Sequence, residues 1–253
     1  MDLAIRDKRA LVTGKSSGIG RGIALALGAE GARLAICARD RQRLTDVADA
    51  LTRAGAAAPV IIVADLATPG GVSAAAIAAR AGLGGVDILV NNAGGSRPLL
   101  QGADEGFWDE AFALNFTAAR RLTQALLPDM RQASWGRIIN ITGAIAQKTV
   151  NAAAPAKVAL LSWSSALASE VARDGITVNC IAPGRINSAQ ILERLYPTEQ
   201  ARQRFIADNI PMGRFGEPAE LAALAVFLAS PLAGYITAAS IPVDGGMYRL
   251  DLR

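Results

Sequence analysis

Histidine is absent from this sequence of 253 residues, and cysteine occurs only twice, at Cys37 and Cys180. Without histidine the chain cannot build a Ser-His-Asp triad or a histidine-ligated zinc site, and two cysteines without a CxxC spacing cannot complete a cysteine cluster. We therefore expect no metal site. Each cysteine lies in an apolar run typical of a buried strand, which favours small core residues kept in a reducing compartment.

The sequence also lacks the segments that direct a chain into or through a membrane. The amino end, MDLAIRDKRA, has no apolar core of a signal peptide. Residues 221–243 carry no charge, but Pro231, Gly234 and Pro242 interrupt them, which predicts a helix followed by a strand rather than a membrane span. We therefore expect a cytoplasmic protein without a membrane partner.

Lysine is scarce as well. Four lysines accompany 22 arginines and 22 acidic residues, so arginine carries most of the net charge of +4. The arginines are scattered along the chain and are not gathered with aromatic residues into a stripe. This pattern is typical of solvated helix faces, and we expect no nucleic-acid partner.

Short runs rich in valine and isoleucine alternate with amphipathic stretches rich in alanine and leucine along the whole chain. The predicted strands are residues 9–13, 33–38, 59–64, 86–90, 136–141, 176–181 and 239–243. This alternation predicts an α/β fold: a single Rossmann-type domain over residues 1–253, with a doubly wound parallel sheet of about seven strands and helices on both faces. The longest irregular region, 183–216, contains a predicted short helix at 198–208 and is the candidate substrate loop.

The first predicted strand runs directly into a glycine-rich turn, TGKSSGIG at residues 13–20, and then into an alanine-rich helix. In such a turn Gly14 permits the tight bend, Gly18 lets main-chain amides approach a pyrophosphate, and Gly20 allows close packing of helix on strand. The spacing is GxxxGxG and not GxGxxG, so an ordinary glycine-rich turn is the alternative. The place of the turn favours a dinucleotide site, formed by Gly14, Lys15, Ser16, Ser17, Gly18, Ile19 and Gly20.

The end of the second predicted strand indicates which dinucleotide is bound. An acidic residue that accepts from a ribose 2′-hydroxyl is expected there, but Ala38 occupies the position and Arg39 follows it. Arg39 and Lys15 can pair with a 2′-phosphate, so the sequence favours NADP(H) over NAD(H). The alternative is that Arg39 begins a solvated helix and is neutralised by Asp40.

The motifs that follow the later strands have the order found in one known family. They are, in chain order, Asp65-Leu66, NNAG at 91–94, Asn115, Lys157 and PGRINS at 183–188. Together with the glycine-rich turn, they resemble the classical short-chain dehydrogenase/reductase family over essentially the full chain. The closing stretch, PMGRFGEPAELAALAVFLASPLAGYITAASIPVDGG at 211–246, is similar to the 3-oxoacyl carrier-protein reductase type of this family.

The resemblance implies an oxidoreductase (EC 1.1.1.-) that acts on a small-molecule carbonyl or alcohol and assembles as a homotetramer or homodimer. It implies that Asp65 accepts from the adenine amino group, that Asn91 and Ala93 line the adenosine ribose, that Ile186 holds the nicotinamide carboxamide and that Ser188 touches the phosphates. The other cofactor-site residues that it implies are Leu66, Gly94, Lys157, Pro183 and Gly184. Taken alone, Asp65 also fits a turn or helix cap, residues 91–94 fit turn chemistry, and Asn115 fits a buried core amide.

The stretch ITGAIAQKTVNAAAPAKVALLSW, residues 141–163, contains no Tyr, His, Cys, Asp or Glu. The chemistry of the family uses a serine after the fifth strand and a tyrosine four residues before the lysine, with the asparagine holding a water relay. Here Ala153 stands four residues before Lys157, and counting from the fifth strand places Gly143 at the serine position. Counting back from Lys157 places that position nearer Asn140, because the segment is shorter than usual. Neither count places a Ser or a Tyr at the expected position.

Three functions remain open at this point. The first is an NADP(H)-dependent oxidoreductase with a substitute proton donor: Thr142, Asn151, Tyr196, or a water held by Asn115 and Lys157. A residue such as Tyr196 is more often a packed loop anchor, and one such as Asn151 is more often a helix cap, whereas Thr142 is equally a plain strand-end residue. The second is a catalytically silent relative that binds the cofactor and acts as a regulator or scaffold, and the third is a lyase or isomerase that uses Lys157 as acid or base. We favour the first, with Asn115, Lys157 and Thr142 as catalytic residues, by analogy with relatives whose nucleotide motifs are intact.

Overall fold

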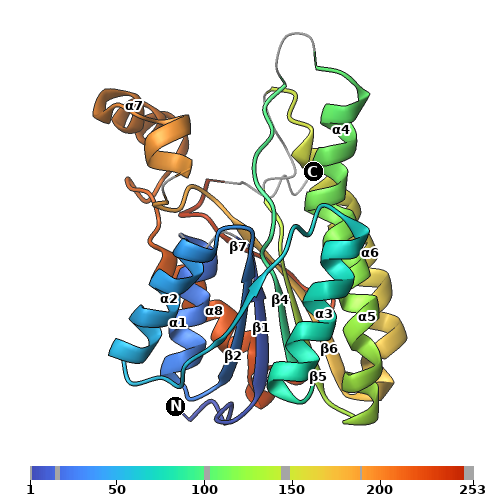
Figure 1. The fold of residues 1–253 in the computed structure, drawn as a ribbon. Helices are drawn as coiled ribbons and strands as arrows, with labels where there is room; N and C mark the ends of the chain where they lie inside the picture. The colour runs from blue at the N-terminus through green and yellow to red at the C-terminus, as the bar shows by residue number, and fades with distance from the viewer. Residues whose placement is uncertain (1, 15–17, 100–102, 144–148, 189, 248–253) are drawn as a thin grey trace.

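The computed structural model describes residues 2–14, 18–99, 103–143, 149–188 and 190–247. Within them, seven parallel strands form one sheet in the order β3-β2-β1-β4-β5-β6-β7 (Figure 1). The strands are β1 (Arg9–Thr13), β2 (Arg33–Ala38), β3 (Val60–Val63), β4 (Ile88–Asn91), β5 (Gly136–Ile141), β6 (Ile176–Pro183) and β7 (Ser240–Val243). The predicted doubly wound parallel sheet is confirmed, and each strand ends within two residues of its predicted range.

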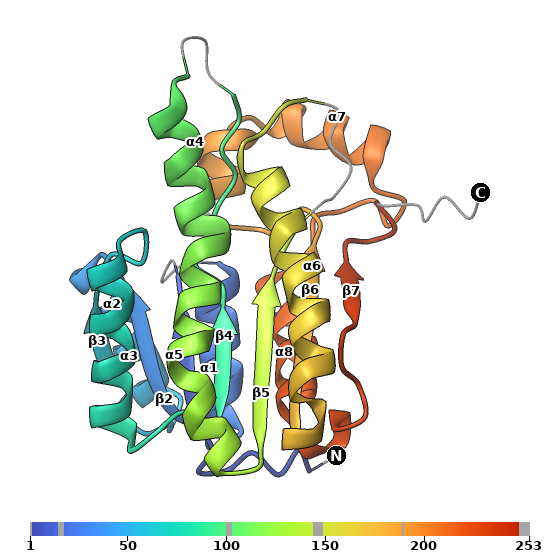
Figure 2. The same cartoon turned by 90° about the vertical axis from the view of Figure 1, so that its right-hand side faces the viewer.

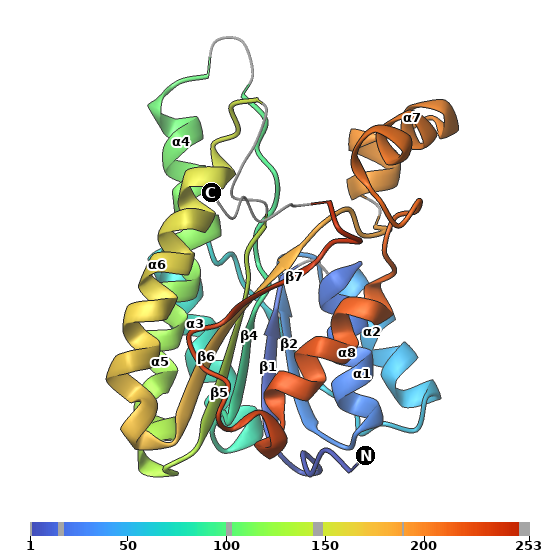
Figure 3. The ribbon, with the colours of Figure 1, turned by 180° about the vertical axis from the view of Figure 1, so that it is seen from behind.

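Helices cover both faces of the sheet, as predicted (Figures 1 and 3). One face carries α1 (Ile19–Ala29), α2 (Arg41–Arg53) and α8 (Pro218–Ala229), and the other carries α3 (Pro69–Leu83), α5 (Ala118–Gln132) and α6 (Ala153–Val171). Because successive side chains of a strand point to opposite faces, Ala10 and Val12 of β1 pack into the first core and Leu11 into the second. A central strand is therefore buried on both faces and mostly apolar, which is why these strands appear in the sequence as runs rich in apolar residues.

Strand β4 begins at Ile88, two residues later than predicted. Asp87 lies in a bend just before it, where its carboxylate pairs with the Arg9 guanidinium at 2.6 Å and accepts the Arg9 main-chain N–H at 2.9 Å. Partial burial raises the pKa of Asp87, but the bonds from Arg9 bring it below its usual range. The pair ties the amino ends of β1 and β4 together, at the edge of the sheet opposite the candidate site.

The remaining helical segments lie mostly in the connections. They are α4 (Glu105–Phe112), η1 (Ala113–Thr117), η2 (Ala172–Asp174), η3 (Gln190–Leu195), α7 (Glu199–Asn209) and η4 (Pro231–Ala233). Figure 2 shows α7 beyond the carboxyl ends of the strands, at the same end of the sheet as α4. Helix α7 confirms the short helix predicted at 198–208, and the Thr198 hydroxyl caps it by accepting the Ala201 N–H at 3.2 Å.

The uncharged segment 221–243 folds as predicted, into most of α8 followed by strand β7. Glu217 and Glu220 form a reciprocal capping box at the start of α8, and Pro218 occupies its first turn. Across the described ranges, no helix combines the length and the apolar character needed to cross a membrane.

Candidate functional site

The carboxyl ends of the strands all lie at one edge of the sheet, where the chain changes direction. Strands β1 and β4 are neighbours, yet the chain leaves β1 towards β2 and β3 and leaves β4 towards β5 and β6. Such a switch point opens a crevice above the strand ends, which is the usual ligand position in open α/β sheets. The predicted nucleotide motifs follow strands that end at this edge (Figure 1).

The turn between β1 and α1 requires glycine at two described positions. Gly14 has a φ of +102°, and a Cβ added there would lie 2.6 Å from Asn92 Nδ2. Gly18 has a φ of +70°, and its added Cβ would lie 2.7 Å from the Ser188 Cβ. No described side chain caps the first N–H groups of α1, and its first turn has no acidic residue, so this terminus can receive an anion. Lys15, Ser16 and Ser17 lie outside the described residues.

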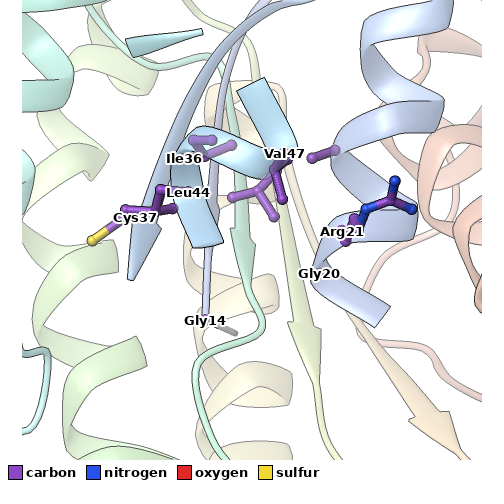
Figure 4. Close-up of a pocket in the computed structure, with 9 residues that line it drawn as sticks. Gly14, Gly20, Arg21, Ile36, Cys37, Leu44 and Val47 are labelled. Carbon is purple, nitrogen blue, oxygen red and sulfur yellow. The ribbon is translucent and has the colours of Figure 1, made fainter. Parts of the chain in front are cut away.

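A small hollow lies beneath this turn. Figure 4 shows the apolar side chains of Ile36, Leu44 and Val47 facing it, with Gly20 and Arg21 of α1 along its border. Its volume is about 10 Å³, which leaves room for about one water molecule. The hollow is therefore a packing gap behind the turn, and a dinucleotide has to lie in front of it, at the open edge.

Two residues of opposite charge follow β2 and β3. Arg39 Nη1 lies 4.0 Å from Asp65 Oδ2, with side-chain exposures of 64% and 44%. An ion pair of this length in solvent is weak, so the Arg39 guanidinium remains able to bind a phosphate. Asp40 pairs with Arg43 and caps α2 rather than neutralising Arg39. Asp65 also accepts the Ala67 N–H at 3.0 Å, so it serves the turn as well.

The residues after β4 tie the central strands together. Thr13 Oγ1 accepts the main-chain N–H groups of Asn92 and Ala93 at 3.1 and 3.2 Å, and Asn92 donates to the Thr13 carbonyl at 2.8 Å. The buried Asn91 side chain donates to Thr123 Oγ1 at 3.0 Å and to Asn140 Oδ1 at 2.8 Å. Asn91 can therefore border a ribose through its main chain only.

The loop after β6 packs closely at the same edge. A Cβ on Gly184, the residue after Pro183, would lie 2.6 Å from the Asp244 Cα, so no side chain fits there. Ile186 is buried, and Ser188 lies against Gly18 of the first turn. The structure thus brings the described motif residues after β1, β4 and β6 to one edge, while Leu66 after β3 is buried in the core below Asp65.

Lys157 lies beside the turn after β4. Its Nζ donates to the Ile141 carbonyl at 2.6 Å, at the end of β5. A Cβ on Gly94 would lie 2.9 Å from this nitrogen, so glycine allows the ammonium to approach the turn. Burial lowers the pKa of Lys157 from 10.5 to about 8, against a smaller opposing effect of the Cys180 thiol. An ammonium has three protons, and no described residue accepts the other two.

Asn115 holds the same turn. It lies in the π-helical turn η1, a conformation found often at functional sites, and is almost completely buried. Its Oδ1 accepts the Gly95 N–H at 3.0 Å and its Nδ2 donates to the Ala111 carbonyl at 2.9 Å. Both ends of the amide are hydrogen-bonded, so Asn115 is a core amide that fixes the turn next to Lys157.

The positions expected for the serine and the tyrosine carry no hydroxyl. Helix α6 begins at Ala153, one turn before Lys157, and the Ala153 side chain is 5% exposed. A Cβ on Gly143, after β5, would meet no heavy atom of the described residues within 4 Å. As far as the described residues go, the space at Gly143 is therefore open. Ala153 is covered, so an aromatic ring there would require the neighbouring chain to move.

Two of the candidate proton donors are engaged elsewhere. The buried Thr142 hydroxyl donates to the Ile181 carbonyl at 3.1 Å. This bond makes Thr142 a tie between β5 and β6 and engages the proton that the predicted catalytic role would need. The Tyr196 ring packs on Phe205 and Phe215, with centroid distances of 4.7 and 5.7 Å, so Tyr196 is a packed loop anchor.

Asn151, the third candidate donor, ties the start of α6 to the turn after β4. Its Oδ1 accepts the main-chain N–H groups of Ala153 and Arg97, both at 3.0 Å, and its Nδ2 donates to Ser96 Oγ at 2.7 Å. Asn151 therefore binds the first N–H of α6 from the turn before the helix, where Ala152 occupies the N-cap position. A neutral amide N–H is far too weak an acid to protonate a substrate oxygen near neutral pH, so the Lys157 ammonium is the remaining acid among the described candidates.

The sequence did not lead us to predict a chain of buried, hydrogen-bonded polar side chains below the site. Asn140 receives the bond from Asn91 and donates to Ser164 Oγ at 2.8 Å, which connects β4, β5 and α6. The signal was present, because Asn140 interrupts the apolar residues at the end of the buried strand GRIINI. Buried polar groups need partners, so a polar residue in such a strand indicates a further polar residue nearby.

Comparison with known proteins places these features in one family. The family model described as enoyl-(acyl carrier protein) reductase matches residues 14–248. The 3-oxoacyl-[acyl-carrier-protein] reductase of Pseudomonas aeruginosa is 37% identical over 250 residues, which cover 97% of this chain and 99% of that protein. The D-beta-hydroxybutyrate dehydrogenase of Cupriavidus necator is 35% identical over 261 residues, with coverages of 96% and 98%.

A solved structure agrees with the sequence matches. The L-sorbose reductase of Gluconobacter frateurii, complexed with NADPH and L-sorbose, superposes with a TM-score of 0.93 at 35% identity and covers 99% of this chain and 100% of that one. The fold and the glycine turn at the switch point define a Rossmann-type protein. Because the family model and the relatives span nearly the whole chain, the protein belongs to the classical short-chain dehydrogenase/reductase family of oxidoreductases.

Proposed function

We propose that the protein is an NADP(H)-dependent oxidoreductase that transfers hydride between nicotinamide and a carbonyl or alcohol substrate, with Lys157 as the proton donor. The observation that carries the proposal is the position of the Lys157 ammonium. It lies at the carboxyl edge of β5, near the open space at Gly143, with one proton bound to Ile141 and two without a described acceptor. A cation held there can bind a substrate oxygen and give it a proton.

The residues at the edge fit a dinucleotide phosphate. The uncapped amino terminus of α1 and the positive-φ glycines Gly14 and Gly18 leave main-chain N–H groups for the pyrophosphate. Arg39 would hold the 2′-phosphate and Asp65 the adenine, since both extend into solvent beyond β2 and β3. The other residues proposed to line the site are Lys15, Ser16, Ser17, Ile19, Gly20, Leu66, Asn91, Ala93, Gly94, Lys157, Pro183, Gly184, Ile186 and Ser188.

When bound, NADPH supplies the hydride that reduces the carbonyl carbon. The task of the chain is to stabilise the negative charge that develops on the carbonyl oxygen and to protonate it. The Nζ ammonium of Lys157 would stabilise this charge and donate the proton. Its pKa of about 8 makes it a better acid near neutral pH than an ordinary lysine. Asn115 and the bond to Ile141 keep the turn and the ammonium in position.

Arg39→Ala is expected to weaken NADPH binding by about tenfold or more and to leave NADH binding unchanged, because a charge-assisted bond to the 2′-phosphate is lost. Fluorescence titration of both cofactors measures the effect. Arg43→Ala is the matched control, since Arg43 lies one turn further along and pairs with Asp40. Equal affinities of the unmodified protein for NADPH and NADH would refute the preference.

The pH dependence of reduction tests the proton donor. Lys157 carries its proton below about pH 8 and is neutral above it. Because the neutral amine is no longer an acid, we expect kcat for reduction to stay level below pH 8 and to fall by about tenfold per pH unit above it. Alcohol oxidation, which needs the neutral amine as base, should show the reverse. A kcat that is independent of pH up to the ordinary range of lysine contradicts the assignment.

A panel of ketones, aldehydes and secondary alcohols, followed by nicotinamide absorbance, tests the reaction itself. Turnover that changes this absorbance supports the oxidoreductase. Tight NADPH binding without turnover on the panel would identify a catalytically silent relative. Product formation without a change in absorbance would identify a lyase or isomerase.

We extend the proposal to the assembly, as a cytoplasmic homotetramer or homodimer. Leu232 and Tyr235, just after α8, are exposed by 53% and 104%, which suits a surface that another subunit covers. Residues 183–216 would form the substrate loop. Light scattering on the purified protein gives the oligomeric state directly.

A further inference from the structure

A cavity of about 290 Å³ lies next to the loop after β6. Its walls come from that loop, from the segment before α8 and from the end of β7, and include Arg185, Ile186, Met212, Arg214 and Asp244. Ile186 is the residue expected at the nicotinamide, so the cavity begins beside the proposed reaction site. Its size suits the remainder of a small substrate.

Arg185 is the unusual residue of this wall. It is half-buried and makes no ion pair with any described residue. Its guanidinium carbon lies 5.0 Å from the ring centroid of Phe205 and 5.8 Å from that of Tyr196, and its Nε donates to the Tyr196 hydroxyl at 3.3 Å. The guanidinium group therefore packs against two aromatic rings, and its remaining N–H groups have no described acceptor.

The other charged groups of the wall are already engaged. Arg214 donates to both carboxylate oxygens of Glu220, at 2.8 and 2.6 Å, and these bonds lower the pKa of Glu220 to about 2. Asp244 accepts the Gly246 N–H at 2.9 Å in its own turn. Among the residues that the structure describes, Arg185 is therefore the cation of this cavity that an incoming anion can use.

Arg185 also lies at the carboxyl edge of the sheet, in the loop next to the one that begins after β5. Strands β5 and β6 are paired from Gly136 to Ile141, and Ile141 faces Ile181. Arg185 follows Ile181 by four residues, and Gly143 follows Ile141 by two, so both loops leave the same edge side by side. A substrate whose carbonyl lies near Gly143 can extend towards Arg185.

We infer that Arg185 binds a carboxylate group of the substrate, so that the protein acts on small oxo acids or hydroxy acids. The planar fork of a guanidinium matches a carboxylate in bidentate geometry, and partial burial against aromatic rings strengthens the bond relative to water. The inference rests on the proposed function for the reaction, but the binding of the anion is a property of the cavity itself.

Acetoacetate and methyl acetoacetate form a matched pair of probes, because only the first carries the charge. We expect the unmodified protein to prefer the acid in kcat/KM by at least tenfold, and Arg185→Gln to lose this preference while still reducing the ester. Arg202→Gln removes a neighbouring arginine that pairs with Glu199 instead, and should keep the acid preference. Equal kcat/KM values for acid and ester in the unmodified protein, or an unchanged preference in Arg185→Gln, would overturn the inference.

A binding measurement separates this inference from the proposed reaction. Acetoacetate is titrated by calorimetry into the unmodified protein and Arg185→Gln, each with NADP⁺ present. Binding that is lost in Arg185→Gln supports the carboxylate site even if neither probe is reduced, in which case only the proposed reaction fails. Undetectable binding, or equal binding by both proteins, refutes the carboxylate site whatever the kinetics show.

Discussion

Lys157→Met is expected to lower kcat for carbonyl reduction by about 10²- to 10⁴-fold, which is the usual contribution of a positioned general acid. Methionine has a similar length and suits a buried position, but it removes both the proton and the bond to the Ile141 carbonyl. Steady-state rates at saturating NADPH measure the loss. A variant that keeps more than a third of kcat shows that another group protonates the substrate.

Protein stability provides a second measurement on the same variant, independent of turnover. The pKa of Lys157 is about 8 in the folded state and 10.5 when exposed, so the unfolded state binds more protons between these values. Stability therefore rises with pH through this window in the unmodified protein and not in Lys157→Met. From pH 7 to pH 9 we expect the unmodified protein to gain about 1 kcal/mol relative to the variant, measured by urea unfolding. Parallel pH curves would show that Lys157 is not held in a desolvated site.

Gly18→Ala is expected to weaken NADPH binding by about a hundredfold, a loss of about 2.7 kcal/mol. The residue has a φ of +70° and a ψ of −129°, a conformation that only glycine adopts without strain. Its new Cβ would also lie 2.7 Å from the Ser188 Cβ, so the turn or the loop after β6 must move. Fluorescence titration with NADPH measures the dissociation constant.

Gly55→Ala is the control for this prediction. Gly55 also has a positive φ, +84°, but an added Cβ there meets nothing within 4 Å, and the residue lies just after α2, away from the turn. It should lower the free energy of unfolding slightly and leave the dissociation constant unchanged. If Gly18→Ala binds NADPH within threefold of the unmodified protein, the turn is not the phosphate site.

Most of the fold could be predicted because its signals are local. Each strand is an apolar run bounded by turn residues, and each predicted strand is present. Helix starts are marked by residues that act within one turn, such as Asp40 for α2 and Thr198 for α7. The start of β4 was misplaced because Asp87 bends the chain to reach Arg9, a partner 78 residues away.

The residues of the candidate site could be predicted from the sequence, but their hydrogen-bond partners could not. The motif order identifies Asn115 and Lys157, yet nothing near Thr142 in the sequence shows that its hydroxyl is used by Ile181, 39 residues further on. In the same way the sequence around Asn151 does not show that its side chain accepts the main-chain N–H of Arg97, 54 residues before it. Hydrogen-bond partners brought together by folding decide whether a polar group is available for chemistry.

The sequence by itself determined the parallel sheet, the glycine turn at its switch point, and the presence of a lysine with no serine or tyrosine at the expected positions. Only the tertiary structure decided what Lys157 is able to do. Burial beside the turn after β4 lowers its pKa, and strand pairing places the Ile141 carbonyl within its reach. Desolvation depends on every atom packed around a group, and those atoms come from segments that are distant in the chain.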